Sequence, residues 1–489
     1  MRFSPLRPAA GLLLVTAVGL AGLGKQADPP ATGPNVIVIM TDDMRLDDLK
    51  YMPNTLHLLA DQGVTFRQML SPYPLCCPAR AELLSGQYSH NNGVQGNAWP
   101  RGGYYKLDSL NTLPVWLQDG GYETAFLGKY LNEYGYRDPY EVPAGWDYWF
   151  GSVSGISGIY DYHWVTTNEG GRVVTHPRVY QTDLFDSRTT DLVDLYADSD
   201  RPYFLWSSYI APHNECVRRT APQDRSCWGA PTPDYGDVGT FDDLVIHDDA
   251  SINEADMSDK GAFMQALPSL SHQRLVGQHR LRIRRIESLQ SVDRAVVHLV
   301  DELKATGQYD NTYLIFTSDN GVQLGEHRWR GKILGYEPSV RVPLIISGPG
   351  LPHGVVRDQA VTMVDLAATV ADLADVTPRR RLDGESLLPL ARGDVPDGRD
   401  RVVPLEAGPR DNTTAGWFYR GVRTDRYTLI VWRNGDTELY DRRRDPLQLD
   451  SVASSPAYAD VQQHLEQRLL QLKNCKGDGC MQWYHVPVS

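Results

Sequence analysis

Two adjacent cysteines stand at the start of a short segment whose residue types suit covalent chemistry, LCCPARAELLSG at residues 75–86. Pro78 suits the first turn of a helix, where its missing N–H group costs nothing, and residues 79–84 continue that helix. Cys76 would then lie at the helix N-terminus, where free N–H groups and the helix dipole stabilise an anion. Arg80 follows one turn later and would reach back towards Cys76. A thiolate nucleophile is one interpretation of this pattern.

Polar side chains also follow three segments that have the pattern of buried strands. They are Asp42 and Asp43 after residues 36–40, His213 after residues 203–210, and Asp319 and Asn320 after residues 313–317. In open α/β sheets, ligands bind beyond the carboxyl ends of the strands. One acidic pair is more often a helix cap or a turn. A second oxygen-rich pair favours a hard cation such as Ca²⁺ or Mg²⁺.

The elements that would position these side chains alternate between strand and helix. Residues 36–40 form a continuous apolar run, which is typical of a strand buried on both faces. Further strands are expected at 122–126, 203–210, 313–317 and 343–346, and helices at 54–61, 113–118 and 283–306. This alternation predicts an α/β fold with a large, mostly parallel (mixed) sheet sandwiched by helices.

The pattern changes after residue 376, which predicts a catalytic domain at 35–376 and a smaller C-terminal antiparallel-sheet subdomain at 377–489. We expect a hairpin there, with strands at 428–433 and 438–440 joined by the turn Asn434-Gly435, and then a helix at 457–473. Within the first domain, residues 218–269 are rich in Asp, Pro and Ser and weakly periodic. We expect them to form a surface excursion that contributes to specificity.

The first residues have the pattern of a signal peptide. Arg2 and Arg7 precede an apolar run at 9–24 that is short for a membrane span. We therefore expect a signal peptide at 1–24, a linker at 25–34 and a secreted protein, with an uncleaved anchor as the alternative. No later segment is long and apolar enough to span a bilayer. The net charge of −13 argues against nucleic-acid binding, so an anionic substrate would need a local cluster of cations.

The six cysteines suit an oxidising compartment. Two pairs bracket short polar loops and are expected to form small disulfides, Cys216 with Cys227 and Cys475 with Cys480. Cys76 and Cys77 are adjacent, so a bond between them would need a strained ring. A zinc site is the alternative, but the sequence lacks paired C-x-x-C spacings.

The segment at Cys76 resembles the signature of the sulfatase family, C-x-P-x-R, whose first cysteine is oxidised to formylglycine. The register is fixed, because a match that starts at Cys76 gives Cys-Cys-Pro-Ala-Arg, whereas one that starts at Cys77 does not fit. Other motifs similar to this family are PNVIVIMTDD (34–43), LGKYLNEYG (127–135), GWDYWFG (145–151), TSDNG (317–321), GEHRWRGK (325–332) and ELYDRRRDP (438–446). Several are most like the N-acetylglucosamine-6-sulfatase and heparan endosulfatase branch, and the resemblance runs from residue 35 to the C-terminus.

The resemblance implies a complete site for sulfate ester hydrolysis. The implied metal ligands, around Ca²⁺ with Mg²⁺ as the alternative, are Asp42, Asp43, the modified Cys76, Asp319 and Asn320. The implied catalytic residues are Cys76, Arg80, Lys129, His213 and Lys332, and the implied substrate contacts are Lys129, His213, Lys332 and His327. In this scheme a hydroxyl of the hydrated aldehyde attacks sulfur, cations stabilise the sulfuryl charge, and His213 protonates the leaving alcohol.

The chain departs from the common family pattern at two positions. Leu131 stands where many sulfatases carry a histidine two residues after the first lysine, so Asn132 or His327 is the candidate for a second proton donor. Ala79 stands where serine is commoner. This change bears on which formylglycine-generating maturation enzyme accepts the chain rather than on the finished site.

The implied substrate is a sulfated glycan, such as one that contains 6-O-sulfated N-acetylglucosamine. Two alternatives stay open: a phosphodiesterase or phosphonate monoester hydrolase of the same alkaline-phosphatase-like superfamily, and a non-catalytic glycan-binding protein. The second is disfavoured, because every matched metal position and both lysines are present. Four aromatic residues are expected to pack in the core, with stacking on sugar as the alternative: Trp146, Tyr148, Trp149 and Phe150.

Overall fold

The computed structural model describes residues 33–154, 160–218, 225–395, 400–408 and 416–484, except for the side chains of 216–228. Its main element is a ten-stranded sheet. In spatial order the strands are β16 (Val355–Arg357), β2 (Gly63–Phe66), β15 (Leu344–Ser347), β11 (Thr312–Ser318), β1 (Asn35–Thr41), β8 (Tyr203–Ser208), β4 (Glu123–Gly128), β5 (Tyr148–Ser152), β6 (Trp164–Glu169) and β7 (Arg172–Pro177). The strands from β11 to β5 are parallel, and β15, β6 and β7 are antiparallel to their neighbours. The predicted mixed sheet is confirmed.

Strand β1 lies inside the sheet, and its side chains alternate between two cores. Val36, Val38 and Met40 belong to one apolar cluster, whereas Ile37 and Ile39 belong to the other. Successive side chains of a strand point to opposite faces of the sheet. A continuous apolar run is therefore the sequence that a strand needs when helices cover both of its faces.

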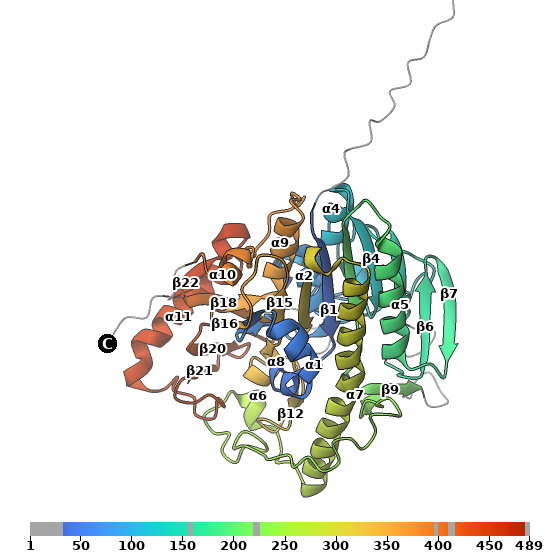
Figure 1. Ribbon diagram of the computed structural model, residues 1–489. Helices are drawn as coiled ribbons and strands as arrows, with labels where there is room; N and C mark the ends of the chain where they lie inside the picture. The colour runs from blue at the N-terminus through green and yellow to red at the C-terminus, as the bar shows by residue number, and fades with distance from the viewer. Residues whose placement is uncertain (1–32, 155–159, 219–224, 396–399, 409–415, 485–489) are drawn as a thin grey trace, which may run out of the picture.

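Helices cover both faces of this sheet. The first cluster contains residues of α2 (Cys76–Ser85), α4 (Leu113–Asp119) and α9 (Met363–Leu373), and the second contains residues of α5 (Gln181–Tyr196) and α7 (His272–Ala305). Figure 1 shows α5 and α7 lying across the same side of the sheet. The aromatic segment before and within β5 packs into these cores, since Trp146, Trp149 and Phe150 are all buried. Core packing, rather than sugar stacking, is what the structure shows for these three rings.

Two helices differ from the sequence prediction. The helix expected at 283–306 begins earlier, at His272, where Ser271 caps it by accepting a hydrogen bond from the backbone N–H of Arg274 at 3.4 Å. Its first turns extend beyond the sheet (Figure 1), so they lack the apolar face by which a helix is recognised in sequence. The helix expected at 54–61 divides into α1 (Pro53–Thr55) and a π-helical turn, η2 (Leu56–Ala60).

The C-terminal part of the chain forms a second sheet, which confirms the predicted antiparallel subdomain. Its order is β21 (Thr437–Asp441), β20 (Tyr427–Trp432), β19 (Tyr419–Arg423), β18 (Asp400–Ala407) and β22 (Gln482–Tyr484), with every pair antiparallel. Gly435 lies in the β20–β21 turn with a φ of 93°, a conformation that favours glycine. α11 (Ala459–Leu472) packs against this sheet, at the left of Figure 1.

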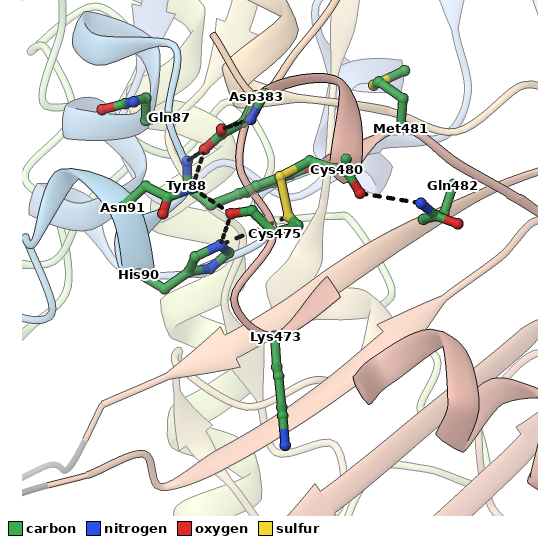
Figure 2. The surroundings of a disulfide bond; sticks show 12 residues. Gln87, Tyr88, His90, Asn91, Asp383, Lys473, Cys475, Cys480, Met481 and Gln482 are labelled. Carbon is green, nitrogen blue, oxygen red and sulfur yellow. Dashed lines mark hydrogen bonds between the residues drawn. A yellow bond between two sulfur atoms is a disulfide. The ribbon is translucent and has the colours of Figure 1, made fainter. Parts of the chain in front are cut away.

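A disulfide fixes the loop that follows α11 (Figure 2). Cys475 and Cys480 are bonded as predicted, and the carbonyl oxygen of Cys475 accepts hydrogen bonds from Asn91 Nδ2 at 2.7 Å and His90 Nε2 at 3.1 Å. These two donors belong to α3 (Ser89–Asn92), which follows α2. The loop is thereby held against the larger domain. The other predicted pair, Cys216 with Cys227, lies outside the described side chains.

The remaining elements are short. They are the sheet of β14 (Arg341–Val342), β3 (Met69–Leu70) and β17 (Val361–Thr362), the pairs β9 (Glu215–Arg218) with β10 (Arg225–Gly229) and β12 (Gln323–Leu324) with β13 (Arg330–Gly331), and the helices α6 (Ala262–Gln265), α8 (Glu337–Val340) and α10 (Leu388–Arg392). Within the described ranges, no helix combines the length and the apolar character that crossing a bilayer requires. The predicted leader at 1–24 lies outside the described residues.

Candidate active site

The acidic segments meet at the carboxyl ends of β1 and β11, which are parallel neighbours paired in register to their last residues. The backbone N–H of Asp43 donates to Asp319 Oδ1 at 3.1 Å, and Asn320 Nδ2 donates to Asp43 Oδ1 at 2.6 Å. Asp42 lies beside them, and all four side chains are buried. Asp43 has a φ of 65°, a left-handed conformation that aspartate tolerates and that turns the chain after β1.

Cys76 is the first residue of α2, as the sequence predicts, and it faces this acidic cluster. Its Sγ lies 3.5 Å from Asp42 Oδ1 and accepts a hydrogen bond from Lys332 Nζ at 2.7 Å. The N-cap residue, Leu75, has no side-chain oxygen to occupy the free N–H groups of the first turn. Burial, followed by the carboxylate of Asp42, raises the pKa of the Cys76 thiol to about 12. The structure therefore does not favour the thiolate interpretation.

Arg80 connects several elements of the site through hydrogen bonds, and its side chain has no exposure to solvent. Its Nε donates to Asp319 Oδ2 at 2.8 Å, and its Nη1 donates to the Lys129 carbonyl at 2.5 Å and to Ser208 Oγ at 2.7 Å. These contacts join the ends of β11, β4 and β8 to α2. Despite burial, Asp319 and Asp42 raise the pKa of Arg80, so the guanidinium stays charged.

Two lysines approach the cluster from different elements. Lys129 follows β4, contacts Asp42, and has its Nζ 4.8 Å from the centre of the Tyr160 ring. Lys332 follows β13 and contacts Asp43. Burial disfavours the charged form of each lysine, but Asp42 raises the pKa of Lys129 and Asp43 raises that of Lys332. Both ammonium groups are therefore held charged inside the protein.

The carboxylates respond differently to the same surroundings. Burial, then the charge of Asp319, raises the pKa of Asp42 to about 7 in spite of Lys129. Burial also opposes ionisation of Asp43, but Lys332 holds the pKa of Asp43 well below its usual range. Crowded carboxylates with one raised pKa indicate a position where additional positive charge would be stabilised.

His213 follows β8 and also borders the acidic cluster. Its Nε2 is 3.5 Å from Asp43 Oδ2, and its Nδ1 is 2.7 Å from the Asn214 carbonyl oxygen, which only accepts. The imidazole stacks on Tyr160, with ring centres 4.0 Å apart. Tyr160 also accepts a hydrogen bond from Asn132 Nδ2 at 3.2 Å. Burial lowers the pKa of His213 to about 3, so the imidazole is neutral before any ligand arrives.

His327 contacts a different set of residues from those that the other predicted site residues contact. It is buried, its Nδ1 contacts Glu254, and its ring stacks on Tyr336 at 4.2 Å. These contacts tie the loop after β12 to residues 251–254, where Ser251 accepts a hydrogen bond from the His327 backbone N–H. Substrate contact by His327 stays a prediction.

The structure adds a residue that the sequence prediction missed. Arg285, in α7, is fully buried and donates to the backbone carbonyls of Asp43 and Pro212. It therefore fixes the turn after β1 and the segment that leads to His213. The available signal was an arginine on the apolar side of an amphipathic helix, next to Ile286 and Leu289. A buried cation in such a place needs partners that the core must supply.

The donor atoms fit a hard cation. Asp42, Asp43, Cys76 and His213 each place a ligand atom within 4.8 Å of the others. Asn320 Oδ1 is buried and lacks a hydrogen-bond partner in the part of the chain that the structure describes. Carboxylate and amide oxygens are the ligands of Ca²⁺ and Mg²⁺, whereas thiolate sulfur suits softer ions. In this set Cys76 offers sulfur and His213 offers nitrogen, so sulfur is the donor that suits a hard cation least.

The sequence matches known families over most of its length. The sulfatase family covers residues 34–376, and a family described as the C-terminal part of N-sulphoglucosamine sulphohydrolase covers residues 325–475. The chain therefore belongs to the sulfatase family. An N-acetylglucosamine-6-sulfatase of Homo sapiens is 32% identical, with 80% of this chain and 70% of that protein covered.

Other relatives are longer than this chain. A Sulf-1 homolog of Caenorhabditis elegans and the extracellular sulfatase SULF-1 homolog of Drosophila melanogaster are each 34% identical over 73% of this chain. The matched regions are 49% and 31% of those proteins, so the chain spans less than half of their length.

Solved structures share the fold. The structure of BT4656 in complex with its substrate, D-glucosamine-2-N,6-O-disulfate, has a TM-score of 0.75 at 23% identity and covers 90% of this chain and 98% of that one. A phosphonate monoester hydrolase of Agrobacterium radiobacter has a TM-score of 0.64 at 22% identity, with 91% and 96% covered. The fold alone thus does not separate sulfate from phosphonate esters.

Proposed function

We propose that the protein hydrolyses sulfate monoesters of sulfated glycans, such as those that contain 6-O-sulfated N-acetylglucosamine. One observation carries the proposal: Cys76 begins a buried helix at a point where Asp42, Lys332 and Asn320 converge. The substrates of the human relative and of BT4656 support the choice of a glucosamine sulfate.

The site is proposed to work with formylglycine made from Cys76 and with Ca²⁺, or else Mg²⁺. Asp42, Asp43, Asp319, Asn320 and the modified Cys76 would hold the cation. The change replaces sulfur by oxygen and so removes the mismatch between a thiol and oxygen ligands. The cation would supply charge stabilisation and the hydrated aldehyde a hydroxyl nucleophile. A formylglycine-generating maturation enzyme is therefore a required partner.

The residues of the chain have separable roles in this proposal. Lys129, which is buried, and Lys332, whose side chain is 14% exposed, would hold the sulfuryl oxygens and spread their charge in the transition state. Arg80 would keep residue 76 and the Lys129 backbone in place through its three contacts. His213 would protonate the leaving oxygen, because an anionic ligand nearby raises the low pKa of its imidazole.

The proposal also covers the domains of the chain, its leader and its location. Residues 35–376 would form the catalytic domain and 377–489 the C-terminal subdomain that is held by the Cys475–Cys480 loop. A cleaved leader at 1–24 and secretion agree with that disulfide and with the extracellular relative from Drosophila melanogaster.

The test is a panel of sulfated mono- and oligosaccharides with an aryl sulfate and matched phosphate and phosphonate esters. We expect release of sulfate, with the highest kcat/KM on 6-O-sulfated glucosamine units. Faster turnover of the phosphonate or phosphate esters would support the phosphonate monoester hydrolase alternative. Loss of all turnover by the mature enzyme would support the non-catalytic alternative.

A further inference from the structure

A groove rich in arginine lies along the first turns of α7, with a volume of about 750 Å³. Its cationic side chains are Arg274, Arg280, Arg284, Arg328 and Arg330. Leu267, Pro268, Leu270 and Trp329 add apolar wall to the same groove. This concentration of positive charge stands out in a chain whose net charge is −13. Such a local cluster is the feature that an anionic partner of an acidic protein requires.

The arginines of the groove are not neutralised in the way that most buried arginines are. In the described part of the chain, Arg274 and Arg280 form no ion pair, and Arg328 donates to three backbone carbonyls rather than to a carboxylate. Arg284 forms an ion pair with Glu287 at 2.6 Å. The groove therefore carries net positive charge that is available to a ligand.

The groove is joined to the candidate active site through one hairpin. The loop between β12 and β13 supplies Trp329 to the groove, β13 supplies Arg330, and Lys332 follows β13 directly. Trp329 Nε1 donates to the Lys332 carbonyl at 3.2 Å. Burial and then the charge of Arg285, the arginine that holds Asp43, lower the pKa of Arg330. The segment that lines the groove therefore leads directly to Lys332, which contacts Asp43.

We propose that this groove binds the sulfate or carboxylate groups of sugars that neighbour the reactive one. The substrate is then a polyanionic glycan chain rather than a single sulfated sugar. Arginine forks match sulfate and carboxylate geometry, and the apolar wall suits the C–H faces of sugar rings. The inference rests on the proposed function and specifies its substrate class.

Gly277 provides a variant that leaves the helix intact. It lies on the groove face of α7, and a Cβ built on it meets nothing within 4 Å. Glutamate at this position would favour the helix over glycine and would place a negative charge in the groove. Gly277→Gln is the matched neutral control, because it adds the same bulk and the same helix preference without charge.

The experiment measures binding of size-fractionated heparin oligosaccharides to a Cys76→Ala background, which separates binding from turnover. We expect affinity to rise with chain length and the Arg274→Gln/Arg280→Gln pair to weaken octasaccharide binding about tenfold, with less than about twofold loss for a disaccharide. Gly277→Glu should weaken octasaccharide binding and Gly277→Gln should not. As a control, Arg172→Gln/Arg188→Gln removes equal charge outside the groove and should leave binding unchanged.

Affinity independent of chain length, or unchanged by both groove variants, would overturn the inference. Equal, arginine-dependent binding of single-stranded DNA of the same charge would also overturn it, since the groove would then be a general polyanion site. In the enzyme with Cys76 intact, the arginine pair should leave aryl sulfate turnover unchanged. That assay reports on the proposed function separately, because its failure would leave the binding result standing.

Discussion

The candidate active site and the arginine groove both gather positive charge, but they treat it in opposite ways. In the site, Lys129 contacts Asp42, Arg80 contacts Asp319, and each of these side chains is essentially inaccessible to solvent. In the groove, Arg274 is exposed and has no carboxylate partner among the described residues. The cations of the site are held in place by buried carboxylates, whereas Arg274 in the groove has no such partner among the described residues.

This difference has an energetic basis. Removing one partner of a buried ion pair leaves an uncompensated charge and costs about 3–5 kcal/mol. An exposed ion pair contributes no more than about 1 kcal/mol. Substitutions of the ion-paired residues in the site should therefore affect folding and chemistry together, and substitutions of the groove arginines should affect long substrates alone. The following predictions are ordered from the largest expected effect to the smallest.

The sharpest contrast inside the site is between its two neighbouring cysteines. Cys76→Ala should abolish turnover, because alanine cannot yield a formylglycine, and should leave the fold intact. Cys77→Ala should keep nearly full activity, because Cys77 packs into the apolar core and not towards the carboxylates. Sulfate release by the two purified variants decides the matter, and full activity of Cys76→Ala would remove the mechanism.

The effect of replacing His213 on kcat should depend on the leaving group of the substrate. His213→Gln should lower kcat on a sugar sulfate by about 10²–10⁴-fold, the usual worth of a proton donor. An aryl sulfate, whose phenolate leaves without protonation, should lose far less. The comparison needs kcat for both substrates in one preparation. Equal losses would assign His213 to binding the sulfate or the cation instead.

A direct test of this difference compares a buried, ion-paired arginine of the site with an exposed arginine of the groove. Arg80→Met should reduce the free energy of unfolding by about 3–5 kcal/mol, because it leaves Asp319 buried without its cation. Arg274→Met should change the same quantity by less than about 0.5 kcal/mol. Urea titrations of both variants provide the values. Similar losses would show that the two regions do not differ in this way.

The smallest effect concerns a pair of side chains that belongs to neither region, His90 and Glu406. His90 Nδ1 is 3.0 Å from Glu406 Oε2. Burial opposes the charged imidazole, but Glu406 raises the pKa of His90 above its usual value. The resulting stability is present below the unfolded pKa and is lost as pH rises through the folded one. The advantage of the wild type over His90→Gln in free energy of unfolding should therefore shrink as pH rises above about 6.5, the ordinary pKa of histidine, which urea titrations at several pH values would measure. A difference that grows with pH would contradict this assignment.

The sequence predicts the centre of the fold better than its margins. Apolar runs such as residues 36–40 identify strands that are covered on both faces, and α2 follows from Pro78 and its neighbours. Edge strands such as β7, which is largely exposed, carry no such signal. The start of α7 is hidden for the same reason, because it projects past the core and turns polar residues outward.

The site shows a similar division. Residues in short motifs at strand ends, such as Asp43, Asp319 and Cys76, could be named in advance because parallel strands end together. Arg285 could not, since its role depends on a helix that crosses the sheet far along the chain. The groove could not be predicted from the sequence either, because α7 and the β12–β13 hairpin meet only in the folded protein.

The central claim is that residue 76 acts as a carbonyl rather than a thiol. The decisive measurement is the mass of the tryptic peptide of residues 68–80 from fully active protein, after alkylation of free thiols. The account predicts one alkylated cysteine, Cys77, with the CH₂SH of residue 76 replaced by CHO or its hydrate. Two alkylated cysteines in protein that releases sulfate at its full rate would contradict it.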